Sequence, residues 1–161
     1  MLRRKRHLVT SSPTTVRYSL VTDEHSFVGD RGERIDVHGW SVYSAAGQPV
    51  LASDDGPIHA DIWFTRIAGM PHHRASQRPE CAPGRLVTLV PEPTNPADKN
   101  AIAVYANRRL VGYVPKNAAK RLAPLLSGRR VEAQITTCYS DGGERIGAHM
   151  IFSLGTPFDL H

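Results

Sequence analysis

The chain has 161 residues, of which 40% are hydrophobic and 22% charged, and its formal net charge is +5. This length favours one domain that buries a core without metal or disulfide staples. The sequence holds no apolar run of about 18 residues, so we expect no membrane span. Its basic start lacks the apolar stretch of a signal peptide. We therefore expect a cytoplasmic location, at the nucleoid if the source is bacterial. Cys81 and Cys138 are too few for a zinc site and are expected to be free thiols.

The positive charge is concentrated in one part of the chain. Residues 61–130 carry a net charge of +8, whereas residues 7–60 carry −4 and residues 131–161 carry −3. Such a basic segment favours attraction to a polyanion through phosphate neutralisation and counterion release. Charge alone does not say which polyanion it binds.

The first 60 residues are expected to form a basic arm followed by an additional β layer. Residues 1–13 are basic and then rich in Ser and Thr, which is typical of a solvated arm, although the Arg-rich start could also grip phosphates. Alternating apolar residues predict strands at 16–22 and 35–43, with a polar loop at 24–34 and a further short strand at 50–52.

The rest of the chain reads as short strands with brief helical segments, which indicates a small β-barrel. Strands are predicted at residues 61–69, 87–90, 101–105, 109–114, 129–139 and 148–154. A long loop follows the first of these strands, at residues 75–84. A basic helix is predicted from Lys116 to Ala123, with a break or kink near Ala123, because Pro124 removes a hydrogen bond and crowds the preceding turn. Pro124 could then open a second turn through Leu125 and Leu126.

One stretch carries a specific motif. Residues 92–104 read EP-x-NP-x-D-x-NAI-x-V and are followed by VGYVPK and an Ala/Leu-rich helix, while residues 67–73 place an apolar residue and Gly before two ring-bearing residues. This pattern resembles the HIRAN domain over roughly residues 62–152 and implies an OB-like or SH3-like barrel. We therefore expect a flexible arm at 1–13, a β extension or accessory segment at 14–60, a HIRAN-type domain at 61–155 and a C-terminal tail at 156–161.

The resemblance implies a protein that binds single-stranded DNA at its 3′ end. It places Asn95 and Asp98 in the loop that holds the end, where Asp98 would accept a hydrogen bond from the terminal 3′-hydroxyl. A carboxylate there would repel the phosphate of a continuing strand, which gives a reason for preferring ends. An alternative, compatible interpretation is that Asp98 caps its own loop as an Asx turn.

The resemblance also implies contacts around this loop. Lys116 corresponds to a basic residue near bound phosphates, with Arg74, Lys120 and Arg121 as weaker candidates. The rings of His72, His73 and Tyr113 correspond to positions that stack on bases.

The sequence departs from the best-known members of the family at several of these positions. Two histidines stand where tyrosines occur, Pro71 replaces a basic residue and Ala97 replaces an aromatic. These changes reduce stacking area and predict weaker or pH-sensitive binding, or a different ligand.

Three functions remain open at the level of sequence. The first is a DNA-binding module that targets itself or a partner helicase or nuclease to DNA during repair or replication stress. The second is an adaptor whose basic face binds an acidic protein. The third is a metal-dependent hydrolase, which the absence of catalytic and metal-binding motifs disfavours, so we expect no cofactor, no metal and no catalysis.

Overall fold

The computed structural model describes residues 14–161, so the predicted basic arm at 1–13 lies outside the described residues. Within residues 14–161 there are nine strands and one α-helix. The strands are β1 (Val16–Val28), β2 (Arg34–Ser44), β3 (Ile62–Ile67), β4 (Leu86–Pro91), β5 (Ile102–Ala106), β6 (Arg109–Tyr113), β7 (Val131–Asp141), β8 (Glu144–Ser153) and β9 (Phe158–Leu160). The helices are α1 (Lys116–Leu126) and three 3₁₀ turns, η1 (Met70–His72), η2 (Arg74–Gln77) and η3 (Pro79–Cys81).

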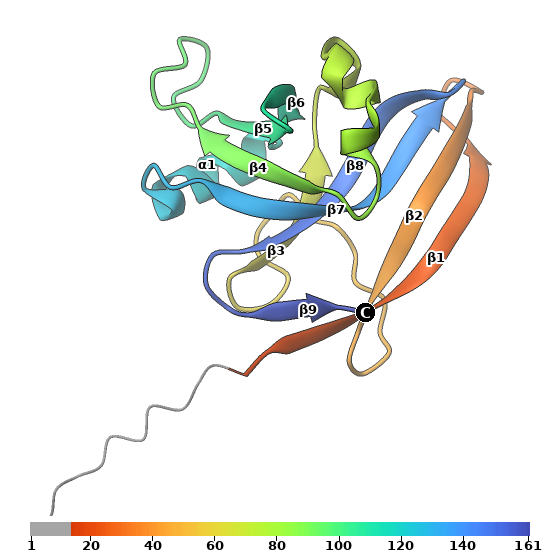
Figure 1. Ribbon diagram of the computed structural model, residues 1–161, viewed down its shortest axis with the longest axis horizontal. Helices are drawn as coiled ribbons and strands as arrows, with labels where there is room; N and C mark the ends of the chain where they lie inside the picture. Colours follow the sequence, from red (N-terminus) through yellow and green to blue (C-terminus); the bar gives the residue numbers. More distant parts are fainter. Residues whose placement is uncertain (1–13) are drawn as a thin grey trace, which may run out of the picture.

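All nine strands belong to one curled sheet (Figure 1). The main order is β6-β5-β4-β7-β2-β1-β9, and β8 branches from β7 to pair with β3. A single isolated bridge between Ala68 and Tyr113 brings the end of β3 beside β6. The sheet is therefore curled like a barrel but is not closed by a continuous ladder, and the predicted mainly β class with short helices is confirmed.

The first two strands extend this sheet. β1 and β2 form a long antiparallel hairpin, and β2 pairs with β7. In Figure 1 the hairpin runs along one side of the molecule, away from α1. Residues 156–161, which were expected to be a tail, contain β9, which pairs in parallel with the start of β1.

Two hydrophobic cores share the β3–β8 pair. Because neighbouring residues of a strand point to opposite faces, Trp63 and Phe152 enter the larger core, where their rings stack with centroids 6.4 Å apart. Ile62, Phe64 and Ile151 enter a second core. The second core is completed by side chains from the extension, chiefly Tyr18 of β1 and Val42 of β2.

The predicted break in the helix is wrong, because α1 continues through Pro124 to Leu126. Leu122 and Leu126 are both fully buried, one turn apart, and hold the two sides of Pro124 in one helix. The helix ends soon afterwards at Ser127, which has a left-handed backbone and donates from its hydroxyl to the Pro124 carbonyl at 3.1 Å.

Other boundaries also differ from the prediction. β1 continues through most of the expected polar loop to Val28, because every residue from 18 to 28 has a partner in β2. The expected strand at residues 50–52 is absent and is replaced by an isolated bridge between Tyr43 and Pro49. The long loop at residues 75–84 is folded largely into η2 and η3.

Gly39 allows β2 to pass close to β7. It has φ +138°, and a Cβ atom at this position would lie 2.8 Å from Cα of Thr137 and in severe collision with the Thr136 carbonyl oxygen. The contact is reinforced by Thr137, whose hydroxyl donates to the Trp40 carbonyl at 2.8 Å. The extension thus depends on a backbone approach that tolerates no side chain.

We predict that Gly39→Ala lowers the free energy of unfolding by about 2 kcal/mol or more, through the clash and the backbone strain together. Urea denaturation of the full chain would measure the loss. Gly147→Ala is the matched control, because nothing lies within 4 Å of a Cβ built there and its stability should change little. Equal stability of the two variants would contradict this account of the β2–β7 contact.

Candidate nucleic-acid interface

The loop of residues 92–101, between β4 and β5, is held in shape by its own polar groups. The Asn95 side-chain oxygen accepts hydrogen bonds from the backbone N–H groups of Ala97, at 2.9 Å, and Asp98, at 3.3 Å. Its amide nitrogen donates to the Glu92 carboxylate at 3.1 Å. Asn95, predicted to contact DNA, therefore uses its side chain to order the loop, which projects beyond β4 and β5 in Figure 1.

Asp98 is half-buried and uses one side of its carboxylate within the loop. Its Oδ1 accepts a hydrogen bond from the N–H of Asn100 at 2.9 Å, which forms the Asx turn considered from the sequence. Its Oδ2 accepts no hydrogen bond from any residue that the structure describes. The loop thus holds Asp98 in a fixed orientation with one oxygen available to a donor.

Two of the predicted rings lie together at the edge of the sheet. The ring centroids of His73 and Tyr113 are 6.1 Å apart, with their planes inclined by 49°. Reciprocal backbone hydrogen bonds between Ala68 and Tyr113, at 2.7 and 2.9 Å, join the end of β3 to β6 and position the short turns that follow. Gly112 permits this approach, because a Cβ there would lie 2.5 Å from the Ala68 carbonyl oxygen.

Glu92 is a site residue that the sequence reasoning did not single out. It accepts a hydrogen bond from Asn95 in the loop, and its carboxylate is near enough to the Tyr113 phenol to raise the pKa of that group. Burial raises the pKa of Tyr113, and the nearby Glu92 carboxylate raises it further because it favours the protonated phenol. Glu92 is the first residue of the EP motif, and this was the only indication of its role in the sequence. Its proximity to Tyr113 becomes visible only in the fold.

The remaining predicted residues are exposed on neighbouring elements. His72 lies in η1 and Arg74 begins η2, and both turns pack against β6. Lys116 and Lys120 lie one helical turn apart on α1, whose N-terminal cap is Pro115. Among the described residues, these four side chains make no hydrogen bond or ion pair, so their charges and rings are open to solvent.

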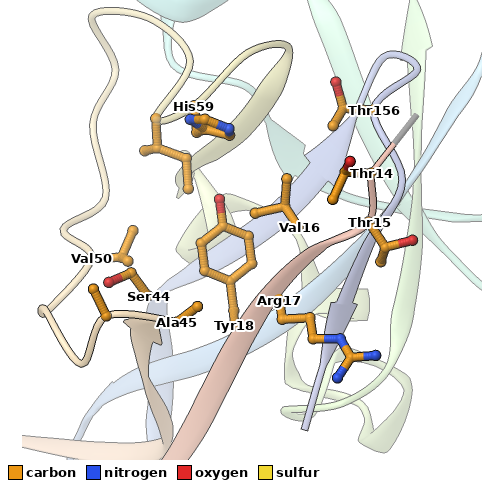
Figure 2. A pocket seen from close by; sticks show the side chains of 12 residues that line it. Thr14, Thr15, Val16, Arg17, Tyr18, Ser44, Ala45, Val50, His59 and Thr156 are labelled. Carbon is orange, nitrogen blue, oxygen red and sulfur yellow. The ribbon is translucent and has the colours of Figure 1, made fainter. Parts of the chain in front are cut away.

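A pocket of about 760 Å³ lies elsewhere, between the start of β1 and the chain around residues 44–59 (Figure 2). Its lining is mainly apolar, and Figure 2 shows the Tyr18 ring between Val16 and Val50 with His59 nearby. None of the residues predicted to bind DNA lines this pocket. The candidate interface is therefore an exposed loop and strand edge rather than this hollow.

The described residues contain neither a cluster of metal-binding side chains nor a membrane-spanning helix. Residues 14–161 contain no group of three or more His, Cys, Asp or Glu side chains placed to hold a metal ion. In the same part of the chain, the single helix is too short and too polar to cross a membrane.

The fold and the site define a small, mainly β domain that presents an ordered polar loop beside two aromatic rings and an exposed basic helix. The family model of the HIRAN domain matches residues 62–155, which is more than half of the chain. The chain belongs to the HIRAN domain family, and the resemblance found in the sequence is confirmed.

Two solved structures are similar to this chain. The crystal structure of the HIRAN domain of human HLTF is 24% identical, with a TM-score of 0.44, and the match covers 56% of this chain and 74% of that one. A crystal structure of a protein from Lactobacillus plantarum is 19% identical, with a TM-score of 0.44, covering 55% of this chain and 89% of that one. No curated protein sequence matched the chain.

We predict that Glu92→Gln lowers the pKa of Tyr113 towards its ordinary value, because the negative charge beside the phenol is removed. The substitution keeps an oxygen that can accept from Asn95, so the loop should persist. Titration by NMR with ζ-carbon-labelled tyrosine would measure the pKa, and Tyr113→Phe would identify its signal. Tyr139 is the internal control, and a Tyr113 pKa that stays unchanged would place Glu92 outside contact with the phenol.

Proposed function

We propose that this chain binds single-stranded DNA and recognises its 3′-hydroxyl end. Membership of the HIRAN domain family supports a DNA-binding module. The observation that carries the end preference is the arrangement of Asp98, whose Oδ1 is engaged by Asn100 while Oδ2 has no partner among the described residues. A terminal hydroxyl is a hydrogen-bond donor and would bind this free oxygen.

Electrostatics favours an end over a continuing strand at this position. A carboxylate accepting from a hydroxyl forms a charge-assisted hydrogen bond, which is short and about twice as strong as a neutral one. A phosphate at the same place adds like charge against Asp98 and offers no donor when it is fully ionised. The loop keeps its shape through Asn95, so the carboxylate would not need to be ordered when DNA binds.

The surface beside the loop would hold the rest of the strand. The neighbouring rings of His73 and Tyr113 would stack on terminal bases, a contact that tolerates any base. Lys116, at the N-terminus of α1, would bind a phosphate together with the positive end of the helix dipole, and Lys120 and Arg74 would add weaker phosphate contacts. The exposed ring of His72 would add stacking area.

The biological role that follows is targeting rather than catalysis. We propose that the chain brings itself, or a partner helicase or nuclease, to free 3′ ends that arise in DNA repair or at stalled replication. The protein would act where DNA is present, in the cytoplasm or at the nucleoid in a bacterium. A binding module of this kind needs neither a metal nor a cofactor.

We predict that Asp98→Asn weakens binding to a single strand ending in a 3′-hydroxyl by roughly tenfold, since a charge-assisted hydrogen bond becomes a neutral one. Asn keeps an oxygen for the Asn100 N–H, so the loop should remain folded. Binding to the same strand blocked by a 3′-phosphate should be maintained or improved, because the repulsion is removed. Fluorescence anisotropy with the two labelled strands measures both affinities.

Blunt duplex of the same sequence is the control ligand for this variant, and its weak binding should be unaffected. If Asp98→Asn reduced binding to the free hydroxyl, the 3′-phosphate and the duplex by equal factors, Asp98 would have no role in recognising the end. The substitution would then be affecting the surface in general.

We predict that Lys116→Ala reduces the slope of log affinity against log salt by roughly 0.7, the amount expected for one phosphate contact on a single strand. The slope is measured by anisotropy at several salt concentrations. Arg17→Ala, on β1, removes the same charge from an exposed side chain outside the proposed surface and should leave the slope unchanged. Identical slopes for wild type and Lys116→Ala would remove Lys116 from the phosphate contacts.

The basic character of residues 61–130 also supports a second candidate, an adaptor that binds an acidic protein. The two functions differ in what competes for the surface. Displacement of labelled DNA by unlabelled DNA, with no displacement by polyglutamate at equal charge, favours DNA. The opposite order favours the acidic partner.

A further inference from the structure

One edge of the sheet is left open on the extension. β1 pairs with β2 along residues 18–28, but on its other side β9 pairs only with residues 16–18. One further hydrogen bond, from the Leu20 N–H to the His161 carbonyl, ends this contact. From residue 21 to residue 28, no strand among the described residues covers the outer side of β1.

The hydrogen bonds show which backbone groups face outward. The backbone groups of Tyr18 and Leu20 both form hydrogen bonds with His161. The N–H and C=O groups of even-numbered residues in β1 therefore face the outer side of the strand. The register with β2 is continuous from Tyr18 to Val28 without a bulge, which preserves this alternation to the end of the strand. The N–H and C=O groups of Thr22, Glu24, Ser26 and Val28 therefore face away from β2.

This edge carries few of the features that usually prevent pairing with another strand. Residues 21–28 contain no Pro, Lys or Arg, and the carboxylates of the two acids, Asp23 and Glu24, are bonded to Ser41, His25 and His38 of the same chain. Val21, Phe27 and Val28 are 51%, 44% and 75% exposed, so apolar side chains lie along an edge that already has strand geometry. Such an edge can bind an extended segment of another chain, which adds to the sheet as one more strand.

We propose that a second copy of this chain pairs with this edge, antiparallel, to form a two-fold symmetric dimer through β1. The four outward-facing residues are Thr22, Glu24, Ser26 and Val28, and His25 lies at the midpoint of this segment. A register centred on His25 therefore uses all four of them on both chains, with Thr22 opposite Val28 and Glu24 opposite Ser26.

The charges of the side chains favour this register over the neighbouring register, which is centred on Glu24. Centring the pair on Glu24 would place two Glu24 carboxylates directly opposite each other, which is destabilising. Centring it on His25 places Asp23 opposite Phe27 and Glu24 opposite Ser26, so no two carboxylates are directly opposite and only the two His25 rings face their own copies. His25 already has an acidic neighbour on its own strand, with its Nδ1 2.6 Å from Oδ1 of Asp23.

The first experiment tests the hydrogen bonds of the edge. Sedimentation velocity of the full chain over a range of concentrations should show a reversible monomer–dimer equilibrium. Glu24→Pro removes an outward N–H without removing a hydrogen bond to β2, and it should shift the equilibrium to monomer. Glu24→Ala is the matched control, since it loses the same side chain but keeps the N–H, and it should still dimerise.

The second experiment tests the register and does not depend on how well the proline variant folds. His25→Cys places a thiol directly opposite its copy at a non-hydrogen-bonded pair, where Cα atoms lie about 4.5 Å apart and a disulfide can form. Diamide should oxidise the two thiols to a disulfide and give a covalent dimer on non-reducing gels. Val21→Cys is the control, because residue 21 lies far from its copy in this register and should remain monomeric.

The native thiols should not interfere with this measurement. Cys81 and Cys138 are both buried, and burial raises the pKa of each to about 11. A wild-type chain that stays monomeric at all concentrations, or equal dimerisation of Glu24→Pro and Glu24→Ala, would overturn the proposal. Equal cross-linking of His25→Cys and Val21→Cys would overturn the register that defines it.

Discussion

The β3–β8 pair is the contact on which the rest of this structure depends. Trp63 and Phe152 stack on one side of it in the larger core, while Phe64 and Ile151 contribute to the second core on the other side. Both faces of the pair are buried at residues 62–65 of β3 and 150–152 of β8, so neither core can be repacked without affecting the other. The family segment and the N-terminal extension therefore share a pair of strands and are stabilised together.

The candidate interface is built mainly from backbone constraints. Gly112 lets β6 approach Ala68, which positions Tyr113 beside the turn that carries His73. Asn95 uses its hydrogen-bonding groups to order the loop that presents Asp98. Ordering before binding reduces the entropy cost of recognition, which suits a surface with few contacts.

How much could be predicted from the sequence differed between parts of the chain. The strands and the ordered loop of the family segment were predictable, because alternating residues, turn residues and a specific motif all indicated the same structure. The continuation of β1 through the polar residues up to Val28 was not, since those residues gain strand geometry from their partners in β2. The helix through Pro124 and the contact between Glu92 and Tyr113 depend on tertiary packing, which no local pattern reveals.

The parallel pairing of β9 with β1 places the first and last described strands side by side. During synthesis the β1–β2 hairpin leaves the ribosome early, with Tyr18 and Val42 still lacking Phe64 and Ile151, their partners in the second core. The sheet can be completed only after residue 160 has emerged. Folding of residues 14–161 during synthesis must therefore wait for β9, the last of the described strands, and the nascent chain carries an incomplete core until then.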